Sequence, residues 1–343
     1  MNSEAFAKPK IMPRASHIVI GICTFQRAGM LDRALQSLKD MAKPGECCIS
    51  IVVADNDSKA TASQVVSGWK DRMDLPLYYL VEPRPGIPFV RNRILRKTKK
   101  LKGDVLVFID DDEYVEPDWL VKLWHAYTAT DADALIGYVR TVYPEDTPGW
   151  IVRGSFYQRD KLNNGQSYLV QAICSLVKVR EWDGVINKST GDLVTFGRTG
   201  NSLIGCKKIV DEMGLQFDED FGLRGGSDAE FFKRAIQKGA RVRWVGDAVV
   251  NEPLQQERMS LAYFIRRNFK SRNYAHEGEI SLKRRGKTAL RGTILGVSGF
   301  LSFPVNIFRG MLYTAQSIKL MVAAVALLLS AANVFVKWEE YKR

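Results

Sequence analysis

The sequence has few of the side chains from which zinc sites and disulfide frameworks are built. Its 343 residues include three histidines, which are scattered, and five cysteines without a C-x-x-C spacing. An odd number of cysteines without a regular spacing argues against a disulfide scaffold, and the scattered histidines argue against a zinc site. Most of the cysteines fall in apolar runs, where a reduced cysteine packs as a small hydrophobic residue. The sequence therefore predicts a protein of a reducing compartment.

The N-terminal segment has no long apolar run. The stretch MNSEAFAKPKIMPRAS lacks the hydrophobic core of a signal peptide. We treat residues 1–15 as a leader and expect the globular body to stay in the cytoplasm.

Several motifs of nucleotide and metal chemistry are also absent. The first apolar run, 17–23, is followed by TFQRAG instead of G-x-G-x-x-G, which excludes NAD chemistry and a Walker-type kinase. The acidic run 110–113 is followed by Tyr114, which does not fit the aspartyl-phosphatase order D-x-D-x-[TV]. The central glycine and distal glutamate of an EF-hand loop are missing there as well.

The net charge of +12 is unevenly distributed. Residues 258–291 carry +8 and residues 292–343 carry +3, so that residues 1–257 are nearly neutral at +1. A strongly basic chain is a candidate nucleic-acid-binding protein. The neutral body and the apolar flanks of the basic segment argue against that partner, and we expect no nucleic acid.

Short apolar runs alternate with helical patterns along the body. This alternation is typical of an α/β fold in which a parallel sheet is covered by helices on both faces. We expect strands at 17–23, 49–54, 77–81, 105–109, 134–142, 202–204, 240–245 and 248–251. We expect helices at 31–38, at 60–72, from about 89, at 116–130 and at 228–238. Residues 144–200 have no clear period, and we interpret them as a substrate-binding region.

Three polar clusters follow expected strands, at the end of an open α/β sheet where ligands bind. They read Thr24-Phe25-Gln26-Arg27, Asp55-Asn56-Asp57-Ser58 and Asp110-Asp111-Asp112-Glu113. Four adjacent acids repel one another unless a cation lies among them, and carboxylate oxygens suit Mg²⁺ or Mn²⁺. Helix N-capping by Asp110 or Asp112 is the alternative, but it does not account for four acids in a row.

With these motifs the sequence resembles the inverting family 2 glycosyltransferases of the GT-A fold, a Rossmann-like, mostly parallel sheet flanked by helices. The resemblance covers residues 16–253, and within the family it is greatest to bacterial exopolysaccharide transferases of the ExoM type. It depends on five segments in order: ICTFQR, VVADNDS, GIPFVRN, LVFIDDDEYVEPDWL and GGSDAEFF.

The resemblance implies a nucleotide-sugar site at the strand ends. Thr24 and Arg27 would line the nucleotide pocket, Asp55 would contact the base or ribose, and Arg91 would reach toward the base or diphosphate. Asp110, Asp111 and Asp112 would form the D-x-D segment of the family. In that segment Asp111 would face the ribose, and Asp112 would hold a Mg²⁺ or Mn²⁺ ion on the diphosphate.

The resemblance also implies that Asp228, in GGSDAEFF, is the general base. A plain helix N-cap is the alternative for this residue. Two positions depart from the family pattern: Ser227 replaces a frequent Glu, and Asn251 replaces a frequent His. Without that His, the metal would depend on Asp112, diphosphate oxygens and water. The departures leave open a catalytically impaired sugar-nucleotide-binding relative.

Other polar and aromatic residues of the body have weaker claims to a role. Trp150 is a candidate platform for the acceptor sugar, or else a core aromatic residue under a loop. Glu230 lies four residues before Arg234, which favours an ion pair on the helix surface over a catalytic role.

The C-terminal part combines positive charge with apolar runs. Residues 258–276 have the pattern of an interfacial amphipathic helix, and 292–308 and 320–336 contain no charge. Buried core helices are the alternative for these runs, which are near the lower length limit for a spanning helix. We favour a membrane-associated region, either a shallow hairpin or two thin spans, whose basic segment faces anionic headgroups.

The predicted organisation is a leader at 1–15, a glycosyltransferase domain at 16–257 and a membrane-association region at 258–343. Residues 16–142 would be the nucleotide-sugar half of the domain and 143–257 the acceptor and catalytic half. The predicted function is transfer of one sugar, with inversion, from a nucleotide-sugar such as a UDP-hexose to a lipid-linked oligosaccharide. We expect this to take place at the cytoplasmic face of a bacterial inner membrane, in the synthesis of an extracellular or cell-surface polysaccharide.

Overall fold

A computed structural model describes residues 16–45, 47–154, 156–157, 189–273, 282–308, 310–332 and 334. The leader, most of the 144–200 region and the end of the second uncharged run lie outside the described residues. Contacts divide the described chain into two compact units, residues 16–140 with 189–252 and residues 141–157 with 253–334. The domain ranges inferred from the sequence stay a prediction.

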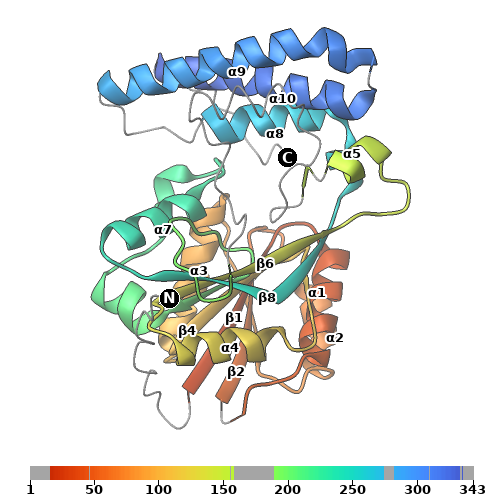
Figure 1. The fold of residues 1–343 in the computed structure, drawn as a ribbon. Coiled ribbons are helices and arrows are strands. Elements are labelled where there is room, and N and C mark those ends of the chain that lie inside the picture. Colours follow the sequence, from red (N-terminus) through yellow and green to blue (C-terminus); the bar gives the residue numbers. More distant parts are fainter. Residues whose placement is uncertain are drawn as a thin grey trace. The chain divides into compact units, whose positions relative to one another are not determined.

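The first unit is an α/β structure built on one sheet (Figure 1). Its strands are β1 (Ser16–Thr24), β2 (Cys47–Asp55), β3 (Leu77–Val81), β4 (Val105–Asp110), β5 (Tyr114–Val115), β6 (Ala134–Val142), β7 (Ser202–Gly205) and β8 (Val242–Pro253). Its helices are α1 (Ala28–Asp40), α2 (Ser63–Lys70), α3 (Ile87–Lys100), α4 (Trp119–Ala129) and α7 (Ser227–Gln237), with shorter helical segments η1 (Cys206–Glu212) and η2 (Glu219–Phe221).

The sheet is mixed. Its strand order is β3-β2-β1-β4-β7-β6-β8-β5, and the first four strands are parallel to one another. β7 then lies antiparallel between β4 and β6, and β5 pairs antiparallel with β8. The expected α/β class is confirmed, and the sheet is mixed because β7, a strand from late in the chain, inserts antiparallel between β4 and β6.

The alternation of side chains along the parallel strands explains the helical layers. Ile18, Ile20 and Ile22 of β1 belong to a buried cluster with apolar residues of α1, α2 and α4. On the opposite face, a Cβ at Gly21 would lie 2.6 Å from the Cγ2 atom of Ile94, so α3 packs directly against the strand. Figure 1 shows helices on both sides of these strands. The parallel strands are therefore buried on both faces, as their continuous apolar runs predicted.

One predicted break within the sheet is absent. Residues 240–245 and 248–251 were expected to form two separate strands. They form the single strand β8 instead. Residues 190–194 run beside β8, where the backbone N–H of Trp244 donates to the carbonyl of Asp192 and the N–H of Gly246 donates to the Thr190 hydroxyl. These partners keep the strand extended through the glycine.

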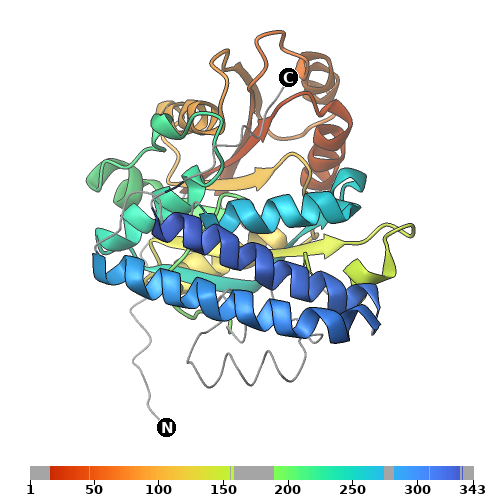
Figure 2. The same cartoon turned by 90° about the horizontal axis from the view of Figure 1, so that it is seen from above.

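The second unit contains α5 (Gly149–Gly154), the short helical segment η3 (Gln256–Met259), α8 (Leu261–Asn273), α9 (Leu282–Phe308) and α10 (Met311–Ala331). α9 and α10 form a helical hairpin and lie side by side, as Figure 2 shows. α10 also contacts α8 and α5. The uncharged run 292–308 lies within α9, which continues through Pro304, and the run 320–336 begins inside α10.

Among the described residues, one segment is long and apolar enough to cross a membrane by length and composition alone. It is Tyr313–Ala331 of α10, which has a mean hydropathy of 1.6 and is half buried within the protein. Length and composition do not distinguish a membrane span from a buried core helix, so this finding leaves both predicted alternatives for the C-terminal runs open.

Candidate active site

Polar residues at the ends of β1 and β4 lie together. The two strands are parallel neighbours, with Cys23 opposite Asp110. The hydroxyl of Thr24 therefore reaches the acidic segment and donates to Asp111 Oδ2 at 2.8 Å. Arg27, in the turn after β1, donates from Nη1 to Asp111 Oδ1 at 3.2 Å and to Asp112 Oδ2 at 3.4 Å. Four predicted site residues thus form one cluster.

The acidic segment after β4 is held largely away from water. Asp111, Asp112 and Glu113 are each no more than 5% exposed. Burial raises the pKa of Asp110 to about 7, and repulsion by Asp112 adds to the effect. Burial also raises the pKa of Asp111 to about 6, although the charge of Arg27 opposes the shift. The negative charges of these carboxylates repel one another, and a bound cation would relieve the repulsion.

Glu113 and a further carboxylate, Glu252, complete this acidic environment. Glu113 Oε2 accepts the backbone N–H of Asp110 at 2.9 Å, and burial, followed by repulsion from Asp110 and Glu252, raises the pKa of Glu113. Glu252 at the end of β8 also raises the pKa of Asp110. Glu252 was not predicted as a site residue, although it directly follows Asn251, one of the two positions that depart from the family pattern.

Gly200 lies against the same acidic segment and was not predicted as a site residue. A Cβ at this position would lie 2.8 Å from Glu113 Oε1 and 3.1 Å from Asp110 Oδ2. The next residue, Asn201, has a positive φ of 57° and is fully buried. Its amide accepts from Trp119 Nε1 at 2.7 Å and donates to the carbonyls of Tyr138 and Ala248. Asn201 therefore fixes the backbone that passes behind the acids.

Asp55 is enclosed by its own loop. It is fully buried, its Oδ1 atom accepts the N–H of Asp57 at 3.0 Å, and its Oδ2 atom accepts the N–H of Ala62 at 2.9 Å and the hydroxyl of Tyr79 at 2.8 Å. These contacts give Asp55 a structural role in closing the turn after β2. Its contact with a base or ribose stays a prediction.

Arg91 connects α3 with the first turn of α7. It is buried, and its Nη1 atom donates to Ser227 Oγ at 2.9 Å. Its charge also lowers the pKa of Asp110 against the effect of burial, which places it near the acidic segment. The guanidinium group therefore holds Ser227, the residue before Asp228, while its charge acts on Asp110.

Asp228 is the second residue of α7. The helix follows Gly226, whose φ of 98° is in the left-handed region, so the N-cap position belongs to Gly226 and not to Asp228. The Asp228 carboxylate is partly exposed and accepts the N–H of Ala229 at 2.9 Å. The N-cap interpretation of this residue is therefore excluded, while the general-base role stays a prediction. On the same helix, Glu230 pairs with Arg234 at 2.8 Å, as its spacing predicted.

The two departures from the family pattern have defined partners. Ser227 accepts from Arg91, as described above. Asn251 in β8 donates to Glu116 Oε1 at 2.9 Å and accepts from Arg140 Nη1 at 3.3 Å, while Arg140 also pairs with Glu116 at 2.8 Å. Asn251 is thus part of a polar triad beside β5.

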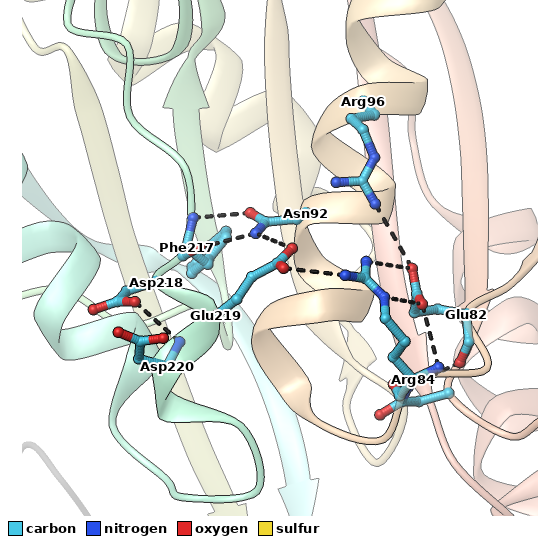
Figure 3. A network of polar contacts seen from close by, with 9 residues as sticks. Glu82, Arg84, Asn92, Arg96, Phe217, Asp218, Glu219 and Asp220 are labelled. Carbon is cyan, nitrogen blue, oxygen red and sulfur yellow. Dashed lines mark hydrogen bonds and ion pairs between the residues drawn. The ribbon is translucent and has the colours of Figure 1, made fainter.

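A network of polar contacts holds α3 and the loop before it to the segment before α7 (Figure 3). Arg84 pairs with Glu82 at 2.9 Å and with Glu219 at 3.1 Å. The side-chain amide of Asn92 donates to the carbonyl of Phe217 at 2.8 Å and accepts its N–H at the same distance. Two segments that are more than 100 residues apart in the sequence are joined in this way.

Trp150 belongs to the second unit. Its ring packs edge-on against Phe264 with a centroid distance of 5.6 Å, and it lies 5.7 Å from Phe156. These contacts fit the core-aromatic alternative, and the partly exposed ring leaves the predicted contact with an acceptor sugar untested.

Comparisons with known proteins assign the class. Residues 19–180 match the family model described as Glycosyl transferase family 2, and the chain belongs to this family. Over 255 residues the chain is 31% identical to the succinoglycan biosynthesis protein ExoM of Rhizobium meliloti (strain 1021). The aligned region covers 74% of this chain and 72% of that protein.

Solved structures confirm the GT-A fold. The mannosyltransferase PcManGT from Pyrobaculum calidifontis, in complex with GDP-Man and Mn²⁺, has a TM-score of 0.54 and 16% identity, covering 91% of this chain and 86% of that chain. TarS residues 1–349 of S. aureus, in complex with UDP-GlcNAc, has a TM-score of 0.50 and 13% identity, covering 94% and 93%.

Proposed function

We propose that this glycosyltransferase transfers a single sugar, with inversion, from a UDP-hexose to a lipid-linked oligosaccharide. The observation that carries the proposal is the cluster in which Thr24 and Arg27 hold Asp111 and Asp112 at the ends of β1 and β4. Ligands of open α/β sheets bind at this edge. The likeness to a succinoglycan biosynthesis protein supports a role in the synthesis of an extracellular polysaccharide.

The residues fit a divalent cation that a diphosphate helps to hold. The described part of the chain has no group of three or more His, Cys, Asp or Glu side chains arranged to bind a metal alone. It does have carboxylates whose pKa values are raised by burial and mutual repulsion. Their oxygen atoms are ligands that suit Mg²⁺ or Mn²⁺, and the charge of the cation would offset the repulsion. Asp112 is the proposed ligand, and diphosphate oxygens and water would complete the coordination.

The reaction requires one proton transfer and one bond exchange. We assign the proton transfer to Asp228, whose carboxylate accepts the proton of the acceptor hydroxyl as that oxygen forms its bond to C1 of the donor sugar. The bond between C1 and the diphosphate oxygen breaks, and its electron pair goes to the diphosphate. A bound cation would stabilise this charge. Arg91 and Arg27 contribute fixed positive charge, and inversion follows because base and leaving group act on opposite faces of the sugar.

Two sequence features support the choice of acceptor and single addition. The basic and apolar tail suits an enzyme that works beside a membrane, where a lipid-linked pyrophosphate acceptor is held. The segment FIRRNFKSR lacks the tryptophan of the Q-x-x-R-W motif found in processive synthases. The proposed location is the cytoplasmic face of the membrane.

A donor screen tests this proposal. The purified full-length chain is incubated with individual nucleotide sugars, Mn²⁺ or Mg²⁺, and a bacterial membrane extract as the source of acceptor. We expect transfer from one UDP-hexose into the lipid fraction, and its loss when EDTA removes the metal. No transfer and no metal-dependent hydrolysis of any donor would leave the impaired, sugar-nucleotide-binding relative as the correct interpretation.

A further inference from the structure

The polarity of α9 is inverted relative to that of a helix on a water-soluble protein. Apart from Thr293, its exposed side chains are apolar: Phe300 is 72%, Val305 61% and Phe308 90% exposed. Its buried side chains include polar ones, with Ser302 at 3% and Asn306 at 2% exposure. A helix on the surface of a soluble protein has the reverse arrangement, with apolar residues toward the core.

The buried polar groups are satisfied by the partner helix. The hydroxyls of Ser302 and Ser317 lie 2.8 Å apart, and the Asn306 amide donates to Ser317 Oγ at 2.8 Å. Ser317, on α10, is fully buried. These hydrogen bonds hold the hairpin together from within and leave its outer surface apolar, an arrangement suited to lipid as the solvent.

Small residues let the two helices approach closely. A Cβ at Gly299 would lie 2.8 Å from Met321 Cγ and 3.0 Å from the Ser317 carbonyl oxygen. A Cβ at Gly292 would lie 3.1 Å from Leu328 Cγ. Close packing on small residues together with hydrogen bonds between helices is typical of helix association in membranes, where burial of apolar surface gives no driving force between helices.

Two criteria select different helices for contact with lipid: mean hydropathy selects α10, and the exposure of apolar side chains selects α9. By composition the candidate is α10, yet half of Tyr313–Ala331 is buried, and α10 contacts α9, α8 and α5. The apolar side chains that are most exposed lie on α9. They form a stripe along the helix, the α9 face, which consists of Leu290, Val297, Phe300, Leu301, Val305 and Phe308.

Charge specifies the kind of surface that the α9 face meets. Residues 280–338 contain no acidic residue and eight basic ones, four of which (Lys283, Arg284, Arg285 and Lys287) lie in the first turns of α9. Lysine and arginine next to an apolar helix face favour anionic headgroups, each adding about 1 kcal/mol near the surface.

We propose that the α9 face docks on an anionic phospholipid membrane, with α9 in the interfacial layer and α10 shielded behind it as the inner helix of the hairpin. The proposal deepens the membrane part of the proposed function and rests on it only for the biological setting. It assigns α9, and not the more hydropathic α10, as the helix that contacts lipid.

The test compares two leucines of equal exposure. Leu301 in the α9 face is 56% exposed and Leu193 in the first unit is 53% exposed. The full-length wild type, Leu301→Asp and Leu193→Asp are floated with vesicles of phosphatidylcholine alone or mixed with phosphatidylglycerol. We expect Leu301→Asp to lower partition into the mixed vesicles at least about tenfold, because an anchoring apolar side chain is replaced by an anion. Leu193→Asp should bind like the wild type, and added salt should weaken binding of both.

Three results would overturn the proposal. The first is equal flotation of Leu301→Asp and Leu193→Asp, and the second is equal binding of the wild type to vesicles with and without phosphatidylglycerol. The third is that Leu301→Asp changes the molar mass of the protein in solution but not its binding to vesicles. The last result would assign the α9 face to a second copy of the chain. Far-ultraviolet circular dichroism shows whether each variant is folded, and Phe308→Asp serves as a second variant if Leu301→Asp is not. Sugar transfer is assayed separately, so vesicle binding without transfer would contradict the proposed function alone.

Discussion

Arg91 of α3 donates a hydrogen bond to Ser227 Oγ at 2.9 Å, and this contact joins α3 to the first residue of α7, the helix that carries Asp228. Both side chains are buried. Because Ser227 carries no charge, the positive charge of Arg91 is not neutralised by this partner. It remains able to interact with the acidic segment and, in the proposed mechanism, with a diphosphate.

Replacing Ser227 tests the structural part of this contact. Ser227→Ala removes the acceptor of a hydrogen bond from a charged donor, and we expect the free energy of unfolding in urea to fall by about 1.5–3 kcal/mol. The Michaelis constant for the donor should rise more than kcat falls, because Arg91 loses the group that orients it. An unchanged unfolding midpoint together with an unchanged Michaelis constant would contradict this role.

Asp112 is predicted to bind the donor through the metal. Asp112→Ala should weaken binding of the UDP-sugar in the presence of Mn²⁺ and leave the weaker binding in EDTA unchanged, as measured by calorimetry. Asp118→Asn is the matched control, since this nearby acid pairs with Lys122 on the surface of α4. Equal metal-dependent binding by Asp112→Ala and the wild type would remove Asp112 from the metal site.

Gly200 is predicted to have no space for a methyl group. Gly200→Ala would place a Cβ against the carboxylates of Glu113 and Asp110, and overpacking of this kind costs about 1–3 kcal/mol. We expect a lower melting temperature and reduced transfer. Gly29→Ala in α1 is the control: a Cβ there meets no atom within 4 Å, and alanine favours the helix. Equal melting temperatures for Gly200→Ala and Gly29→Ala would show that the backbone at residue 200 shifts at no cost, which would contradict the prediction.

The pair Glu82 and Arg84 predicts how stability depends on acidity. Burial acts to raise the pKa of Glu82, but hydrogen bonds from Arg84 outweigh it and hold the pKa below its ordinary value of 4.5. Because the folded state binds this proton less readily than the unfolded state, the stabilisation is complete above that value and is lost as the pH falls through the lowered pKa. Urea unfolding at neutral pH and at about pH 3 should show a smaller loss for Glu82→Gln than for the wild type. An identical pH dependence for the two proteins would contradict the assignment.

Much of the first unit could be predicted because its signals are local. Continuous apolar runs such as 17–23 and 105–109 indicated strands that are buried on both faces. The polar residues directly after these runs indicated the candidate site at the strand ends. The α/β pattern placed Thr24 and Asp111 at one edge of the sheet, and they meet there because β1 and β4 are parallel neighbours in the structure.

The remaining features depend on contacts between distant segments. The insertion of β7 between β4 and β6 is not encoded in the period of any one strand. The need for glycine at position 200 comes from Glu113 and Asp110, which lie about ninety residues earlier in the chain. The apolar runs of the tail predicted helices, but which of them is enclosed depends on how α8, α9 and α10 pack.

The most direct test of the proposed mechanism compares Asp228→Asn with Glu230→Gln. Both residues lie in the first turns of α7, and both variants are measured in the transfer assay with the donor that the screen identifies. We expect Asp228→Asn to lose transfer by at least about a hundredfold while it still binds the UDP-sugar, because the base is removed and the donor contacts remain. Glu230→Gln should retain transfer, since Glu230 pairs with Arg234. The wild-type product should have the anomeric configuration opposite to that of the donor, as read by NMR. Full transfer by Asp228→Asn, or retention of configuration by the wild type, would contradict the proposed mechanism.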